Sequence, residues 1–534
     1  MASRNNNYKR NKNIKGKTQN KGGQKQRTRD NAEYTSEDLK DSRNDVSWYS
    51  TDPNILRDAA SIPFSWSVGT AIYDVFDTPV TIPGLMVQYL VPSIGYTESI
   101  TDPVNLASTS LYSFIRHANS GHVNYDDLDL TVMIVCASSV YSFINWAQRI
   151  YGLAFMYAQR NRYMPNAIFE AENIDAHDIV EHLADFRYGI NVLINKMASI
   201  WVPANMTIFS RQAFLYQNIY CEGPSIKDQL YMYSPYGFYI HEFDKDGAGC
   251  ARLLALKSIH PDASKLKTSD ILWLGNHLLD ALLDQEDIGI MCGDIYKAYG
   301  DGGIIKLAPL PEMYLVAPVY DQAVLTQMKN ATTLDIDVNV VLPDKERENF
   351  AVVQDDKKSH LIHKPHIPNV FEEDEVYNWY VRLMRRSRLI TIDAEDITPD
   401  MIMESSRLMF SVDPCNDVTL DKFGAMYTGS EIVMSCKVFQ MDAFTGACGM
   451  CPCDTVTFYQ PDVPWLAAVY AAWNHFKYHP FARVAWASNA DQQALAPAFD
   501  VDNYGVLSHT DIQRLNEAAL LNEFGMHGIA KVIR

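Results

Sequence analysis

The sequence predicts a mainly α-helical protein with a smaller β component, an α+β fold, that follows a disordered N-terminal arm. Long stretches repeat apolar residues every three or four positions, which is the spacing of one helix face. Shorter stretches in the middle of the chain alternate apolar and polar residues, as half-buried strands do. The first thirty residues contain almost no apolar side chains. We therefore expect helices at both ends of the folded part and a mixed region between them.

The N-terminal arm is basic in a chain that is otherwise acidic. Residues 1–29 hold ten Lys or Arg and no Asp or Glu, and Ile14 is their only aliphatic residue larger than Ala apart from Met1. Such a segment buries too little apolar surface to offset the entropy of ordering its backbone, so we expect it to be disordered. Because residues 1–30 carry a net charge of +9 and the whole chain carries −19, residues 31–534 carry −28.

The charges of the arm predict contact with nucleic acid. A flexible cationic segment binds phosphates through counterion release and reads no bases, whereas the acidic remainder of the chain repels the same polyanion. A nuclear address and a solubilising tail are the alternatives. A mitochondrial or secretory signal does not fit, because the arm has neither an apolar face nor an apolar core. The predicted RNA-binding residues are Arg4, Lys9, Arg10, Lys12, Lys15, Lys17, Lys21, Lys25, Arg27 and Arg29.

Helix signals begin shortly after the arm. Asp52 and Pro53 are a typical cap and first residue, and Pro63 ends the helix that they open. A long helix is expected over 126–160, with acidic residues at its start and basic residues at its end, as the helix dipole favours. Its stretch 130–147 is long enough to span a membrane, but its Ser, Thr and Asn residues favour a buried helix of a large core.

Five further helices follow from periodicity and charge. The clearest apolar stripe lies in residues 175–199, at Ile179, Leu183, Phe186, Ile190, Leu193 and Met197. We also expect helices from Ser269 to Leu282, over 373–389 and near 464–476. A last helix is predicted over 510–524, with Thr510 and Gln513 as its capping box.

Strands are predicted mainly in the middle of the chain. Residues 333–341 alternate Leu, Ile and Val with polar partners, as a half-buried strand does. Residues 312–319, 431–439 and 455–459 are the other expected strands. The 30 Tyr residues also fit extensive protein–protein contact, because Tyr is enriched in interfaces.

Three thiols are the sharpest candidates for a metal site. Cys448, Cys451 and Cys453 lie within six residues, and Cys436 or a distant His would have to complete a tetrahedral zinc site. We expect instead a tight turn with free thiols, no bound metal and no cofactor. The nine Cys residues without a recognisable secretion signal also indicate a reducing compartment.

Other clusters favour exposed segments over sites. His360, His363 and His366 are spaced as metal ligands or pH sensors, but neighbouring Lys and Pro residues predict an exposed loop. Residues 244–249 resemble a calcium loop in which Ala stands at ligand positions, so we expect a turn. A second phosphate-binding patch is the alternative to a solvated helix end for Arg382, Arg385, Arg386 and Arg388.

Motifs of common enzymes are missing from the sequence. It contains no GxxxxGK[ST], GxSxG or HExxH pattern, and the plentiful carboxylates cannot be paired into an acid–base couple without geometry. We therefore expect no catalytic residues and no enzymatic activity.

Two stretches resemble picobirnavirus capsid proteins. They are DVSWYSTDPNILRDAASIPFSWSVG, residues 45–69, and YSFINWAQRIYGLAFMYAQRNRYMPNAI, residues 141–168. The resemblance implies a shell protein of a small double-stranded RNA virus. It further implies sixty two-fold dimers per icosahedral shell, a helical shell domain, a protruding domain at the dimer contact, and an inward-facing arm that contacts packaged RNA. The protein would then occur in the virion, and in the host cytoplasm during assembly.

The expected organisation combines this resemblance with the residue patterns. We expect a disordered basic arm over 1–46, a first part of the helical shell domain over 47–210, a mixed protruding and dimerisation region over 211–460, and a helical return to the shell over 461–534. A cytoplasmic enzyme with an RNA-tethering tail is one alternative. An RNA-coating nucleoprotein is another, although a body charge of −28 disfavours the basic groove that it needs. Membrane contact while a virus enters its host is left open.

Overall fold

The computed structural model divides the chain into two compact units, Met1–Ser65 and Trp66–Arg534, which are described separately. The described residues are 48–49, 51–61, 71–73, 79–81, 84–121, 123–157, 164–223, 228–262, 264–334, 350–355, 357, 359–365, 388–412, 425–441, 448–452, 472–481, 483–489, 492–497 and 503–525.

The described part of the first unit contains one helix, α1 (Pro53–Ala60). The Asp52 side chain accepts a hydrogen bond from the Asn54 amide at 2.8 Å, and Pro53 occupies the first helical position. The Asp52 oxygen satisfies one unpaired N–H group of the helix start, and Pro53 has no N–H group to leave unpaired, which confirms the predicted cap.

The second unit is organised around the 31-residue helix α3 (Asp127–Tyr157). The Asp126 carboxylate accepts from the amides of Leu128 and Asp129, both at 3.0 Å, and so caps its first turn. Among the described residues, α3 is the one helix long and apolar enough to cross a membrane, and 94% of its most apolar window is buried inside the protein. The expected buried core helix is confirmed.

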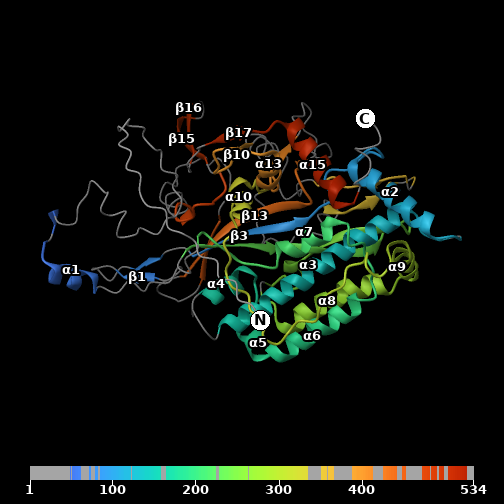
Figure 1. Ribbon diagram of the computed structural model, residues 1–534, viewed down its shortest axis with the longest axis horizontal. Coiled ribbons are helices and arrows are strands. Elements are labelled where there is room, and N and C mark those ends of the chain that lie inside the picture. The colour runs from blue at the N-terminus through green and yellow to red at the C-terminus, as the bar shows by residue number, and fades with distance from the viewer. Residues whose placement is uncertain are drawn as a thin grey trace, which may run out of the picture. The chain divides into compact units, whose positions relative to one another are not determined.

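A five-stranded sheet lies against α3. Its order is β14 (Cys448–Pro452), β13 (Glu431–Met441), β3 (Leu85–Pro92), β5 (Leu230–Pro235) and β4 (Tyr220–Cys221). β3 and β5 are parallel, and the other neighbours are antiparallel. Every residue of β3 is buried, which explains its nearly continuous apolar sequence. In Figure 1, α3, α6 and α8 lie on one side of β3 and β13, and α10, α13 and α15 lie on the other.

The predicted apolar stripe of residues 175–199 is confirmed as a buried face, but it spans two helices. α5 (Ala176–Glu181) and α6 (Leu183–Met197) meet at His182, whose backbone is not helical. Every stripe residue is buried except Leu183, which is partly buried. α8 (Thr268–Leu283) packs beside α6, and a Cβ on Gly189 would lie only 2.5 Å from Leu272. Glycine at this position therefore lets the two helices approach closely without displacing the Leu272 side chain.

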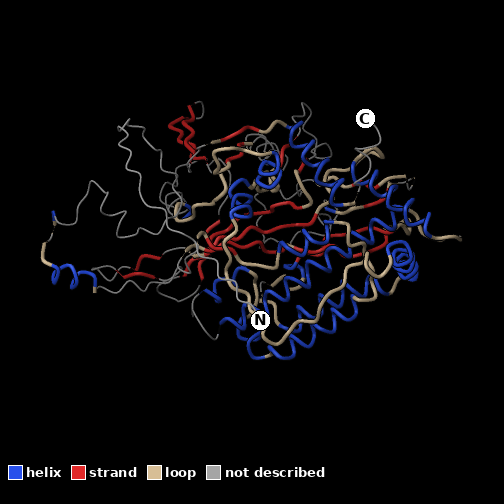
Figure 2. The backbone as a smooth tube through the Cα atoms, in the orientation of Figure 1, coloured by secondary structure: helices blue, strands red, loops and turns tan. Residues whose placement is uncertain are grey.

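The remaining elements surround this core, and Figure 2 distinguishes their helices, strands and loops. The helices are α2 (Pro103–Ala118), α4 (Met164–Ala171), α7 (Thr207–Leu215), η2 (Leu256–Ser258), α9 (Glu286–Tyr299), α10 (Gln322–Asn330), α13 (Pro399–Ser405) and α15 (His509–Glu523). The paired strands are β1 (Ala71–Tyr73) with β2 (Pro79–Thr81), β6 (Gly237–Phe243) with β7 (Gly249–Ala255), β8 (Val353–Gln354) with β9 (Leu361–Ile362), β10 (Leu389–Thr391) with β17 (Tyr504–Val506), β11 (Phe410–Val412) with β12 (Ala425–Tyr427), and β15 (Arg483–Asn489) with β16 (Gln492–Pro497). The predicted turn at 244–249 connects β6 to β7, with Gly247 at φ 75°.

Two predicted local structures are wrong. Residues 312–319 form no strand, and only Val319 makes a β-bridge, to Tyr220. The helix predicted over 510–524 is present as α15, but its cap is Ser508 with Asp511, two residues before the predicted cap at Thr510, because this pair satisfies the first amides.

Helices are the larger component of the described residues and strands the smaller one, so the predicted α+β class is confirmed. The helix predicted near Ser269 and the strand predicted over 431–439 are present as α8 and β13. The segments 335–340, 366–387 and 453–471 lie outside the described residues. They contain all or most of four predicted elements. These are the strands predicted over 333–341 and 455–459 and the helices predicted over 373–389 and near 464–476.

Candidate functional site

The predicted RNA-binding residues, from Arg4 to Arg29, all lie outside the described residues. Of the second cationic cluster, only Arg388 is described, and it is exposed directly before β10. Both nucleic-acid predictions therefore stay predictions.

The three clustered cysteines do not form the expected tight turn. Residues 448–452 are the strand β14, in which Cys451 lies opposite Val438 of β13. The cross-strand hydrogen bonds of β13 hold this segment extended, and Cys453 lies outside the described residues. Cys436 on β13 is a buried free thiol. Across the described residues, no group of three or more His, Cys, Asp or Glu is arranged to hold a metal ion.

The histidine run is not an exposed loop at its centre. His363 is fully buried, and its Nε2 lies 2.9 Å from the Ser93 hydroxyl while its Nδ1 lies 3.1 Å from the Ala351 carbonyl. Its backbone also exchanges two hydrogen bonds with Thr97, both at 2.8 Å. These contacts fasten the segment after β9 to the end of β3, which overrides the local charge pattern. His366 lies outside the described residues.

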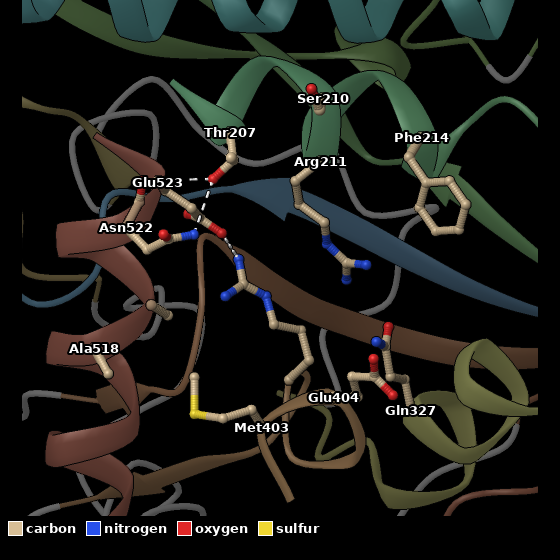
Figure 3. Close-up of a pocket in the computed structure, with 12 residues that line it drawn as sticks. Thr207, Ser210, Arg211, Phe214, Gln327, Met403, Glu404, Ala518, Asn522 and Glu523 are labelled. Atoms are coloured by element: carbon tan, nitrogen blue, oxygen red, sulfur yellow. Dashed lines mark hydrogen bonds and ion pairs between the residues drawn. The ribbon is translucent and has the colours of Figure 1, made fainter. Parts of the chain in front are cut away.

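The structure shows a pocket that the sequence does not predict. It has a volume of about 580 Å³ and is lined mainly by α7, α13 and α15, with Gln327 from α10. Figure 3 shows Arg211 reaching from α7 toward the same space as Gln327 and Glu404. Arg211 Nη2 is buried and has no hydrogen-bond partner among the described residues.

Four charged side chains form a buried network at this pocket. Arg211 Nε donates to Glu431 Oε1 at 2.7 Å, and Arg407 Nε donates to Glu431 Oε2 at 3.1 Å. Arg407 Nη2 donates to Glu523, the last residue of α15, and to the Ser430 hydroxyl at 3.0 Å. The network therefore joins α7, the turn after α13, β13 and α15, which are far apart in the sequence.

The pKa values of the two carboxyl groups in the network are shifted in opposite directions. Burial alone would raise the pKa of Glu431, but Arg211 and Arg407 lower it to about 2. Burial also raises the pKa of Glu523, and the charge of Glu431 raises it further, although Arg407 acts against both. Burial disfavours the Arg407 cation, yet the two carboxylates raise its pKa. One carboxylate is thus held ionised by two cations, while the other shares one of those cations.

This network of ion pairs holds separate segments of the fold together. Each of the four charged groups is hydrogen-bonded to at least one other member, and their formal charges cancel. Such a network fixes the positions of four segments. The sequence offered no signal for it, because more than ninety residues separate Arg407 from the two members outside its neighbourhood, Arg211 and Glu523.

Comparison with known proteins identifies the family. The sequence profile of the family described as "Picobirnavirus, Capsid protein" matches residues 48–443. The chain belongs to the picobirnavirus capsid protein family. A capsid protein precursor of Human picobirnavirus (strain Human/Thailand/Hy005102/-) is 28% identical over 390 residues, which cover 69% of each chain. The X-ray crystallographic structure of the picobirnavirus capsid matches with a TM-score of 0.75 at 20% identity, covering 92% of this chain and 99% of that one.

The family match confirms the resemblance seen in residues 45–69 and 141–168, since nearly all of these residues lie in the matched region. It covers both the helical core and β13 with its network residue Glu431. The structural match shows that the chain shares the fold of a capsid protein. The chain is accordingly a structural protein of the capsid class.

Proposed function

We propose that this chain assembles as two-fold dimers, sixty to an icosahedral shell, and that the shell encloses a double-stranded RNA genome. The family match over residues 48–443 carries the proposal, and the fold shared with a picobirnavirus capsid supports it. The protein acts without catalysis, resides in the virion and assembles in the host cytoplasm.

The arm supplies the contact with RNA. Ten cations on residues 1–29 neutralise phosphates without reading base edges, so binding is independent of sequence. The net charge of −28 on residues 31–534 keeps the duplex from adhering elsewhere. This separation of charge supports an inward-facing arm that tethers the genome.

Two altered chains test the role of the arm. One lacks residues 1–30, and the other keeps its full length but has Gln at all ten Lys and Arg positions of residues 1–29. Both should form shells, since the first thirty residues contain almost no apolar side chains, and both should lose most of the packaged RNA. Electron microscopy scores the shells, and the absorbance ratio at 260 and 280 nm with extracted nucleic acid scores the RNA.

Each outcome is informative. RNA equal to that of the unaltered chain in both variants would refute the tether. Loss of shells in the deletion variant alone would show that the length of the arm has a structural role. A chain that forms no closed particles under any condition would refute the proposed assembly.

A further inference from the structure

One uncharged surface segment, residues 313–320, has two apolar faces. Its sequence is MYLVAPVY, in which every side chain is apolar or aromatic. Val316 is buried and Tyr314 is half-buried against α3, where a Cβ on Gly152 would come within 2.6 Å of Val316 and 3.0 Å of Tyr314. The intervening side chains point outward, so that Met313 is 83% exposed and Leu315 is 51% exposed.

The backbone of this segment is also largely unpaired among the described residues. Within the part of the chain that the structure describes, residues 313–318 make no backbone hydrogen bond. Pairing starts only at Val319, whose amide donates to Ile219 at 2.9 Å and whose carbonyl accepts from Cys221 at 2.9 Å. Val319 thereby joins β4, the edge strand of the five-stranded sheet, in a parallel bridge. Among the described residues, the segment is therefore an unpaired continuation of a sheet edge.

This edge lacks the charged residues that usually protect exposed edges. Soluble proteins place Lys or other charged residues on such strands, because free N–H and C=O groups recruit further strands. Residues 313–320 contain no charge, and Pro318 is their only residue without an amide donor. An exposed apolar row beside free backbone groups is the pattern of a surface that another strand covers.

We propose that residues 313–317 are an interface at which a second copy of this chain pairs, edge to edge. This inference rests on the proposed self-assembly. A two-fold axis brings the same segment of two copies together in antiparallel register, so a single uncharged strand complements itself. The outward Met313 and Leu315 rows then pack in one apolar layer.

Two other classes of partner fit less well. RNA requires cations, and this segment has none. A lipid interior leaves free N–H and C=O groups unsatisfied at a cost of several kcal/mol each, whereas a partner strand satisfies them. The second copy meets both the apolar and the hydrogen-bonding requirement.

Hydrogen exchange on the full-length chain tests the pairing directly. Backbone amides of residues 313–317 should exchange rapidly in dissociated protein and become at least tenfold slower in assembled protein. A third sample contains dissociated protein with phosphatidylcholine vesicles, in which these amides should stay rapid. Protection by vesicles, or unchanged exchange in particles whose other regions gain protection, would overturn the proposal while leaving self-assembly intact.

Substitution gives an independent measurement. Leu315→Asp places a charge on the outer face, and because this side chain is half-exposed the monomer should keep its near-ultraviolet circular dichroism. Its self-association constant, from sedimentation equilibrium, should fall at least tenfold. The matched control is Leu283→Asp, at an exposed leucine that ends α8, which should weaken association less. Equal association of Leu315→Asp and unaltered protein would refute the interface, whereas no association of the unaltered protein would refute the proposed function.

Discussion

Two buried ion networks in this protein pair their carboxylates with different sets of partners. In the helical core, Glu172 accepts from Arg149, from Trp146 Nε1 at 2.7 Å and from the Ser234 hydroxyl at 2.9 Å. At the pocket, Glu431 instead pairs with both Arg211 and Arg407, and Glu523 pairs with Arg407 alone. The first network is one carboxylate with one cation and two neutral donors. The second is a chain of four charges.

The difference lies in how many charged groups surround each carboxylate. A carboxylate with a dedicated cation and neutral donors has no like charge beside it. Where two carboxylates share Arg407, each raises the energy of the other's ionised form, and the less favourably paired one has its pKa raised. The pocket network therefore couples the anchoring of α15 to protonation.

The largest expected effect is in the core network. Glu172→Gln leaves the Arg149 guanidinium fully buried without a counter-charge, which should cost about 3–5 kcal/mol of unfolding free energy. Urea denaturation of dissociated protein, followed by far-ultraviolet circular dichroism, measures it. The control Glu172→Leu with Arg149→Met removes both charges and should recover most of the loss. A cost below about 1 kcal/mol for the single change would contradict the comparison.

Glu431→Gln should have the next largest effect, and its effect should depend on pH. Because the pKa of Glu431 is lowered to about 2, the ionised carboxylate stabilises the fold above its ordinary pKa of 4.5, and this stability is lost as the pH falls from 4.5 toward 2. The substitution should cost about 3 kcal/mol at pH 7 and progressively less below pH 4.5. Unfolding curves at several pH values measure the difference, and a cost that stays constant with pH would show that ionisation is irrelevant.

Glu523→Gln should show the opposite dependence on pH and a smaller effect. The raised pKa of Glu523 means that its contribution to stability is greatest below 4.5 and is lost as the pH rises through the folded-state value. Gln resembles the protonated form, so the variant should gain in melting temperature relative to unaltered protein as the pH rises from 4 to 8. A relative loss over this range would mean that the Arg407 contact outweighs burial.

The sequence predicts those parts of the fold that depend on local order. The stripe from Ile179 to Met197 and the cap at Asp52 were predictable because helix periodicity and capping involve neighbouring residues. Residues 312–319 were predicted as a strand for the same reason, yet a strand also needs a partner, and the described chain offers one only at Val319. Their alternation is real, but the partner cannot be deduced from a local pattern.

The candidate site was beyond sequence reasoning for a related reason. Arg211, Arg407 and Glu523 belong to no motif, and only the fold brings them together. His363 shows the reverse error, since a local run of His and Lys predicted exposure while contacts with Ser93 and Thr97 bury it. Charge patterns predict solvation only where no distant segment supplies hydrogen-bond partners.

The smallest expected effect tests how α15 presents Glu523 to the pocket network. The Ser508 hydroxyl accepts from the Asp511 amide at 3.1 Å, and the Asp511 carboxylate accepts from the Ser508 amide at 2.9 Å. Ser508→Ala removes half of this box and should cost about 1 kcal/mol, as lost helix caps do. Thr510→Ala is the matched control, because Thr510 lies inside the helix and its loss should cost no more than a few tenths of a kcal/mol. Thermal unfolding of both variants at pH 7 separates them. An equal or larger loss for Thr510→Ala would place the cap where the sequence predicted it and would shift the start of α15 by two residues.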